Sequence, residues 1–182
     1  MRTRLLLMLL CICSMNIAQI KTPQKSDNSV ILRGTDYAFS IFIPQGWILD
    51  TLERSMALAS KAVLYTNDTT YTLDGIIIAT ATKKIEGKET LKNLLTYFAK
   101  QDSEYTPPVK RVDAPSIVTR DKKTTIIKRR FGGNGYLSTT AYIDDRNVVT
   151  VITLWRNTED EFNKSIPAFN QVVGSYSSIA IN

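Results

Sequence analysis

The chain has 182 residues, of which 43% are hydrophobic and 22% are charged, and its formal net charge is +6. This composition is that of an ordinary globular protein, so it excludes wholesale disorder and collagen-like or low-complexity architectures. The sequence contains no histidine and only two cysteines, Cys11 and Cys13. A chain of this length is expected to form one domain with its own hydrophobic core.

The N-terminus has the pattern of an export signal. Arg2 and Arg4 precede an apolar run over residues 5–12, and a more polar stretch containing the small residue Ala18 follows. The apolar run is shorter than the roughly 20 residues that a membrane-spanning helix needs, which favours a cleaved signal over a membrane anchor.

These features predict the organisation of the whole chain. We expect a signal peptide over residues 1–18, a flexible polar lead-in over residues 19–34 and a single domain over residues 35–182. Both cysteines lie in the predicted signal, so the mature domain would contain none. The protein is accordingly expected to be exported by a bacterium and to be periplasmic or extracellular.

The first half of the domain is dominated by strand patterns. Every second residue over 37–43 is aromatic or β-branched, which predicts a strand with one well-buried face. A proline and a glycine end this strand, and the large ring of Trp47 is expected to be buried beside the turn. Two more strands are predicted over residues 61–66 and 74–82. Residues 52–59 are ambiguous, because Met, Ala and Leu favour a helix but the segment is too short to decide.

A helix and a proline-rich segment follow. Residues 89–101 place three leucines and Phe98 at i, i+3, i+4 and i+7, which predicts an amphipathic helix lying on a sheet. Residues 105–116 contain three of the six prolines. Because proline cannot donate to a sheet ladder, this segment is expected to be an exposed connector or an edge strand.

The second half of the domain predicts a meander and a closing helix. Three strands are expected over residues 123–131, 135–143 and 148–155, joined by turns rich in Gly, Asn and Asp. The last helix begins with a capping box at Thr158, and Pro167 is expected to kink or split it. This order predicts an α+β fold in which an antiparallel sheet of about six strands is covered by two main helices.

Two segments resemble the PsbP-like group, the superfamily that includes the extrinsic protein of the photosynthetic oxygen-evolving complex and many exported bacterial proteins. They are YAFSIFIPQGW at residues 37–47, an opening strand followed by proline, glycine and tryptophan, and the closing helix over residues 162–178, which contains VVGSY. The resemblance implies an α/β/α sandwich built on an antiparallel sheet, and it implies no enzymatic activity.

The residue types present exclude several kinds of chemistry. Without histidine there is no Ser-His-Asp or Cys-His machinery, and zinc or copper sites built from imidazole and thiolate are excluded in the mature domain. Asp144, Asp145 and Asn147 are more typical of a tight turn than of a calcium site. The glycines around Asn134 are followed by a strand, whereas a phosphate loop requires a helix. We therefore predict no enzyme, no cofactor and no metal.

Positive charge is concentrated in one stretch, residues 110–130, which holds eight basic residues and two acidic ones. One explanation is that lysines on an edge strand prevent edge-to-edge pairing of sheets. The other is a contact surface for an anionic partner, with Lys122, Lys123, Lys128 and Arg130 as the candidate residues.

Two functions remain open. The first is an exported cell-envelope binding or accessory protein that acts through its surface on an unknown envelope protein or anionic envelope component, including a peripheral membrane contact. Nucleic acid is not expected as a partner, because aromatic residues do not interleave with the basic cluster. The alternative is a small-molecule or lipid carrier with a pocket between helix 89–101 and the sheet, lined by Trp47, Tyr97 and Phe98. The oligomeric state is left open.

Overall fold

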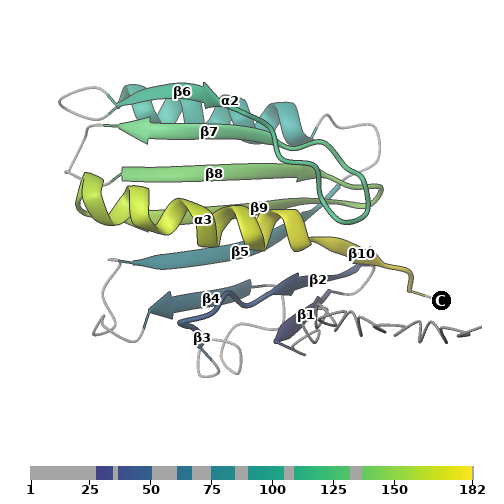
Figure 1. The fold of residues 1–182 in the computed structure, drawn as a ribbon. Coiled ribbons are helices and arrows are strands. Elements are labelled where there is room, and N and C mark those ends of the chain that lie inside the picture. Colours follow the sequence, from purple (N-terminus) through teal and green to yellow (C-terminus); the bar gives the residue numbers. More distant parts are fainter. Residues whose placement is uncertain are drawn as a thin grey trace, which may run out of the picture.

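The computed structural model describes residues 28–34, 37–50, 61–66, 75–84, 90–104, 109–131 and 137–181. These residues form strands and two helices in an order that Figure 1 follows from purple to yellow. The elements are β1 (Ser29–Arg33), β2 (Ala38–Phe42), β3 (Trp47–Leu49), β4 (Lys61–Thr66), β5 (Ile76–Lys83), α2 (Thr90–Ser103), β6 (Lys110–Ala114), β7 (Ile126–Phe131), β8 (Leu137–Asp144), β9 (Val148–Arg156), α3 (Glu159–Ser175) and β10 (Ser177–Ile179).

A seven-stranded sheet forms the centre of the molecule, with the strand order β3-β4-β5-β9-β8-β7-β6. Every neighbouring pair in it is antiparallel. Figure 1 shows α3 in front of this sheet and α2 behind it. The predicted α+β fold, an antiparallel sheet with helices on its faces, is therefore confirmed.

The structure contains more strands than the predicted six, since β1, β3, β6 and β10 are additional. Strands β1, β2 and β10 form a second, three-stranded antiparallel sheet. Strand β2 is the first strand that the sequence predicts, and its alternation places Phe39 and Ile41 in the core. Strand β1 lies inside the predicted lead-in, so the folded part begins earlier than expected. The reason is that Val30 and Leu32 alternate with exposed residues and are buried against the same core.

The larger core lies between the main sheet and the layer formed by α3 and the small sheet. Helix α3 contributes Phe162 and Phe169, and β9 contributes Ile152 and Leu154. All four side chains are buried. Because helix α3 contacts β9, β8 and β2, it holds the two sheets together.

The smaller core lies on the opposite face of the main sheet, under α2. Leu91, Leu94, Leu95 and Phe98 of α2 pack against β8 and β9 at Tyr142, Val149 and Val151. This is the predicted apolar stripe of the helix, and it faces the sheet as expected.

Helix α3 begins as predicted, because the hydroxyl of Thr158 accepts a hydrogen bond from the backbone N–H of Glu161 at 3.3 Å. Of the two effects predicted for Pro167, a kink or a split, the split does not occur, since α3 is continuous over Glu159–Ser175. Pro167 lies on the exposed side, where water can satisfy the carbonyl that lacks a helical partner, while Phe162 and Phe169 anchor the buried side.

Two other expectations are refined by the structure. The proline-rich segment does contain an edge strand, β6, at one end of the main sheet. Trp47 is half-buried rather than largely buried, because it begins β3 at the opposite edge. Its ring packs on the larger core and lies 5.6 Å from the guanidinium carbon of Arg156.

Some predictions concern residues outside the described ranges. These are the signal peptide over 1–18, most of the lead-in, the ambiguous segment over 52–59 and the glycine turn around Asn134. Among the described residues, no helix has the length and apolarity needed to cross a membrane.

Candidate functional site

The four residues proposed from the sequence as a contact surface do not form one patch. Lys122 and Lys123 lie in the connection between β6 and β7, whereas Lys128 and Arg130 lie within β7. Strand β7 pairs with β6 on one side and with β8 on the other, so it is not an edge strand. Prevention of edge-to-edge pairing therefore does not explain Lys128 and Arg130 of β7, although the adjacent strand β6 is an edge strand.

Arg130 is buried, with 6% of its surface exposed, in a charged group that we call the α2 cluster: Asp102, Arg111 and Arg130. Asp102 lies in the last turn of α2 and is also buried. The Arg111 guanidinium donates to both carboxylate oxygens of Asp102, and Arg130 Nε lies 3.4 Å from Asp102 Oδ1. Two guanidinium groups thus share one carboxylate beneath the helix.

The register of the sheet explains how this group forms. Arg111 of β6 is directly opposite Arg130 of β7, so both side chains point to the same face, the one that α2 covers. Arg111 Nη1 also donates to the Tyr142 hydroxyl at 3.2 Å. Burial acts to lower the pKa of Arg111, but the hydrogen bond and charge of Asp102 outweigh it and raise the pKa. The cluster fastens α2 to the sheet.

Lys128 is also engaged within the sheet. It is opposite Asp113 in the register of β6 and β7, and its Nζ lies 2.5 Å from Asp113 Oδ1. This pair is exposed on the Asp113 side and joins the two strands of the sheet edge. The pairing leaves little uncompensated charge at this position.

Lys123 belongs to a second charged group, at the end of the molecule where β10 lies. We call it the terminal cluster: Asp121, Lys123, Asp145 and Tyr176. Lys123 Nζ bonds to the Asp121 carboxylate and lies 3.4 Å from Asp145 Oδ1. The hydroxyl of Tyr176, whose side chain is fully buried, donates to Asp145 Oδ2 at 2.9 Å. Here two carboxylates share one lysine.

Asp121 also ties β10 to the connection between β6 and β7. Its Oδ2 accepts hydrogen bonds from the backbone N–H and the hydroxyl of Ser178, both at 3.0 Å, and its Oδ1 accepts one from Thr119 at 2.5 Å. Partial burial acts to raise the pKa of Asp121, but the bonds from Lys123, Thr119 and Ser178 lower it from 3.8 to about 2. Asp121 is therefore ionised at neutral pH.

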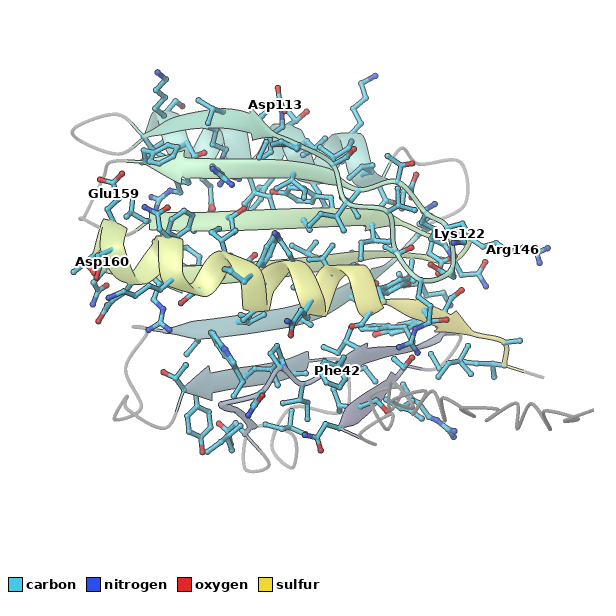
Figure 2. All side chains as sticks on the ribbon, viewed as in Figure 1. Phe42, Asp113, Lys122, Arg146, Glu159 and Asp160 are labelled. Atoms are coloured by element: carbon cyan, nitrogen blue, oxygen red, sulfur yellow. The ribbon has the colours of Figure 1, made fainter. Side chains whose placement is uncertain are left out.

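The surface around the terminal cluster carries an excess of positive charge. The three carboxylates here each contact a lysine, because Asp144 lies 2.5 Å from Lys84 and the other two contact Lys123. Exposed cations are left in the two turns that meet there, and none forms an ion pair with another described residue. We call them the cationic end: Arg120, Lys122 and Arg146. Figure 2 places Lys122 and Arg146 together at this end.

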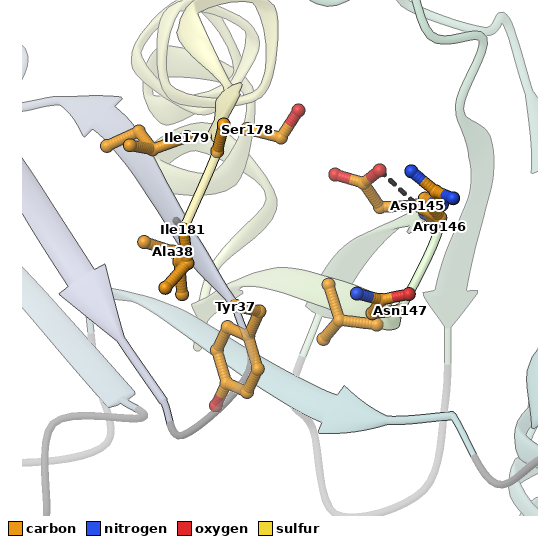
Figure 3. A pocket seen from close by; sticks show the side chains of 10 residues that line it. Tyr37, Ala38, Asp145, Arg146, Asn147, Ser178, Ile179 and Ile181 are labelled. Carbon is orange, nitrogen blue, oxygen red and sulfur yellow. Dashed lines mark hydrogen bonds between the residues drawn. The ribbon is translucent and has the colours of Figure 1, made fainter.

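A pocket of about 430 Å³ opens beside the cationic end. It lies between the start of β2, the turn from β8 to β9, and β10 with the residues that follow it (Figure 3). The lining residues are Tyr37, Ala38, Asp145, Arg146, Asn147, Val148, Ser178, Ile179, Ala180 and Ile181.

The pocket predicted between the first long helix and the sheet is not formed by its proposed residues. Phe98 packs against Tyr142 with ring centroids 6.2 Å apart, which fills the space beneath α2. Tyr97 is 55% exposed, and Trp47 lies at the far edge of the sheet. A groove of about 460 Å³ does run along one side of α2, where Leu91 and Leu95 are among its lining residues.

The described residues contain no group of three or more His, Cys, Asp or Glu placed to hold a metal ion. Asp144 and Asp145 belong to a turn in which the backbone N–H of Asp145 donates to the Val148 carbonyl at 2.9 Å.

Sequence reasoning missed Arg146 and Tyr37 as candidate residues. Arg146 follows two aspartates, so its charge looks neutralised in the sequence, but both carboxylates bond to lysines from other elements. The alternation over residues 37–43 indicates only that Tyr37 lies on one face of a strand. The position of each depends on contacts between segments far apart in the chain, which no local spacing indicates.

No protein-family model matches the sequence, and no curated protein does. Similar structures nevertheless exist. The cyanobacterial PsbP (CyanoP) of Synechocystis sp. PCC 6803 has a TM-score of 0.54 and 14% identity over 84% of this chain and 93% of its own. LpqN, involved in cell envelope biogenesis of Mycobacterium tuberculosis, has a TM-score of 0.52 and 14% identity over 82% and 90%.

A third similar structure is that of the Ran-binding protein Mog1p of Saccharomyces cerevisiae, with a TM-score of 0.50 and 14% identity over 84% of this chain and 95% of its own. At this level of identity the likeness concerns the fold alone. The chain shares the fold of the PsbP-like proteins, so the resemblance predicted from residues 37–47 and the closing helix is confirmed at the level of fold.

Proposed function

We propose that this is an exported, non-catalytic binding protein of the bacterial cell envelope, and that it contacts an anionic envelope component through the cationic end. The observation that carries the proposal is the charge distribution at that end. The carboxylates of Asp121, Asp144 and Asp145 are occupied by lysines, while Arg120, Lys122 and Arg146 remain exposed without a described ionic partner. Exposed cations of this kind attract an anionic surface over a Debye length.

The proposal changes the residues expected to make contact. Lys122 stays in the set, whereas Lys123, Lys128 and Arg130 are replaced by Arg120 and Arg146. Lys123 and Arg130 bond to carboxylates within the fold, and Lys128 pairs with Asp113 across the edge of the sheet. The charges of these three residues therefore stabilise the fold.

The similar structures support a binding role of this general kind. LpqN is involved in cell envelope biogenesis, and Mog1p is a Ran-binding protein. The absence of histidine from the chain removes the most common general base, which favours binding over catalysis. The export pattern at residues 1–18 supports a location in the envelope.

The test is sedimentation of the protein with vesicles of phosphatidylglycerol and phosphatidylcholine. The parent protein should bind at low salt and be released as the salt approaches 1 M, where the Debye length falls to about 3 Å. The triple variant Arg120→Gln, Lys122→Gln, Arg146→Gln should bind roughly 100-fold more weakly, since each cation near an anionic surface contributes about 1 kcal/mol.

A matched control removes three exposed cations from elsewhere: Lys100→Gln, Lys110→Gln and Lys164→Gln, on α2, β6 and α3. Both triple variants have the same net charge, so a difference between them reports the position of the charges. Equal binding by the two variants would show that the cationic end has no special role. Failure of the parent protein to bind at low salt would refute the proposal outright.

A further inference from the structure

The pocket beside Arg146 has an apolar side and a polar side. Figure 3 shows Ile181 and Ala38 on one side, Tyr37 below them, and Asn147 and Arg146 opposite. This division is suited to a ligand that has an apolar part and a polar head. The volume of about 430 Å³ lies within the range of roughly 300–1,000 Å³ typical of sites for small molecules.

The apolar side is held in place before any ligand binds. Gly34 donates its backbone N–H to the Tyr37 carbonyl at 2.9 Å, and the Tyr37 ring lies so close to Gly34 that a Cβ there would be 2.3 Å from the ring. The ring also stacks on Phe39 with centroids 6.5 Å apart. Only glycine at position 34 leaves room for the ring, so the wall is preformed.

The polar side is fixed by the terminal cluster. Ser178 is bonded to Asp121 through its backbone N–H and its hydroxyl, which positions β10. Asp145 accepts bonds from the Tyr176 hydroxyl and from the backbone N–H of Arg146, the latter at 2.6 Å, which positions the turn. Both walls of the pocket are therefore tied to the body of the domain.

The charges around the pocket select an anionic head. The carboxylate of Asp145 shares Lys123 with Asp121 and accepts a hydrogen bond from the Tyr176 hydroxyl. The guanidinium of Arg146 has no ionic partner among the residues that the structure describes, and it is exposed at the rim. A carboxylate or phosphate would supply the missing partner, with the Asn147 amide as a neighbouring donor.

We propose that this pocket binds a single amphiphile with an anionic head, such as a fatty acid or an alkyl phosphate, with its head at Arg146 and its chain against Tyr37 and Ile181. The proposal rests on the proposed function and deepens it, because Arg146 belongs to both sites. It places the ligand at the end of the molecule near β10, whereas the sequence predicted a carrier pocket beneath α2. It concerns a dissolved molecule, whereas the vesicle experiment measures contact with a surface.

The experiment is isothermal titration calorimetry of the full domain with decanoate, compared with decan-1-ol, acetate and decyltrimethylammonium. Decanoate should bind at one site and more tightly than the other three, because it alone has both the chain and the negative charge. Arg146→Gln should weaken decanoate about tenfold, which corresponds to about 1.4 kcal/mol, and should leave decan-1-ol unchanged. Lys100→Gln, which removes an exposed cation of α2 away from the pocket, should change neither.

Two variants test the apolar wall. Gly34→Ala should displace the Tyr37 ring and weaken both decanoate and decan-1-ol, and Ile181→Ala should do the same to a smaller degree. Ile181 is 49% exposed near the end of the chain, so its substitution leaves the fold intact even if Gly34→Ala does not fold. The proposal is wrong if decanoate shows no saturable binding, or if Arg146→Gln and Ile181→Ala both leave its affinity unchanged.

Further variants separate this proposal from the proposed function. Arg120→Gln with Lys122→Gln should weaken vesicle binding and leave the decanoate affinity unchanged. Ile181→Ala should weaken decanoate and leave vesicle binding unchanged. Decanoate binding without vesicle binding would support the pocket alone, and vesicle binding without decanoate binding would refute the pocket alone.

Discussion

The α2 cluster and the terminal cluster use the basic stretch of residues 110–130 in opposite ways. In the α2 cluster, two arginines of this stretch share the carboxylate of Asp102 beneath a helix. In the terminal cluster, the carboxylates of Asp121 and Asp145 share Lys123. In the α2 cluster, the arginines pair with a carboxylate beneath a helix and contribute little charge to the surface. In the terminal cluster, a lysine pairs with the carboxylates, so that the neighbouring cations remain exposed without an ionic partner among the described residues.

The comparison shows that a local excess of charge in a sequence does not predict a charged surface. A charge that becomes buried needs a partner, because desolvation would otherwise cost several kcal/mol. Arg111 and Arg130 find theirs in α2, a segment that precedes them in the chain. Arg146, by contrast, lies outside the basic stretch and contributes to the cationic end.

The largest effect is expected when the carboxylate shared by Arg111 and the buried Arg130 is removed. Asp102→Asn keeps the shape of the side chain but leaves the guanidinium groups of Arg111 and Arg130 without their shared negative charge. We expect the free energy of unfolding to fall by about 3 kcal/mol, measured by urea denaturation.

The matched control is Asp113→Asn, which breaks the pair with Lys128 at the exposed edge of the sheet. This variant should lose less than about 1 kcal/mol, as exposed ion pairs do. If the two variants are equally stable, the α2 cluster does not behave as a buried group and the contrast between the clusters fails.

A smaller loss is expected from the terminal cluster when Tyr176→Phe removes the hydroxyl that donates to Asp145. The bond is buried on the tyrosine side, and burial raises the pKa of Tyr176 well above its usual value, so the hydroxyl keeps its proton. We expect the free energy of unfolding to fall by about 1.5 kcal/mol. Asp145 retains Lys123, which limits the loss.

Tyr97→Phe is the control, because its exposed hydroxyl accepts a hydrogen bond from Gln101 at 2.7 Å. That variant should have the stability of the parent protein within about 0.5 kcal/mol. A loss of several kcal/mol with Tyr176→Phe would instead mean that the terminal cluster is as essential to the fold as the α2 cluster.

The sequence predicted the fold largely through periodicity. The alternation around Phe39, the leucine stripe ending at Phe98 and the cap at Thr158 each depend on residues close together in the chain, and each is found in the structure. The second sheet could not be predicted in the same way. It requires β10 to pair with β2, and nothing local in either strand indicates that partner.

The candidate site was harder to predict from the sequence than the fold, for the same reason. Lys122 was identified, but Arg130 was placed on the surface because the sequence does not show that Asp102 of α2 covers it. The pocket depends on Tyr37, whose ring packs beside Gly34, lying across from the turn between β8 and β9, more than half of the chain away. Such contacts are determined by the topology. The local pattern predicts the fold class but not which distant segments lie side by side.

The pH dependence of stability distinguishes the terminal cluster further. Because the pKa of Asp121 is lowered to about 2 in the folded protein, its contribution is fully present above the unfolded value near 4 and is lost as the pH falls through about 2. Asp121→Asn should cost about 1 kcal/mol at pH 7 after allowance for solvent screening. The difference from the parent should disappear between about pH 4 and pH 2.

The measurement is urea denaturation of the parent and of Asp121→Asn at several pH values from 7 to 2. A difference in stability that stays constant over this range would contradict the lowered pKa. It would show that the substitution removes only a hydrogen bond and that the charge of Asp121 does not stabilise the fold.

The smallest expected effect on stability concerns Lys122. Variants of this residue test both the stability of the fold and the binding to vesicles. Its φ is +68°, in the left-handed region, within a turn closed by its backbone N–H and the Thr119 carbonyl at 3.0 Å. A side chain there costs about 1 kcal/mol, whereas glycine avoids that strain and loses somewhat more entropy on folding. Lys122→Gly should therefore stabilise the fold by about 0.5 kcal/mol, while Lys122→Ala should not. Both should weaken vesicle binding equally, because both remove the charge, so a difference in binding between them would mean that the backbone of this turn, and not the cation, makes the contact.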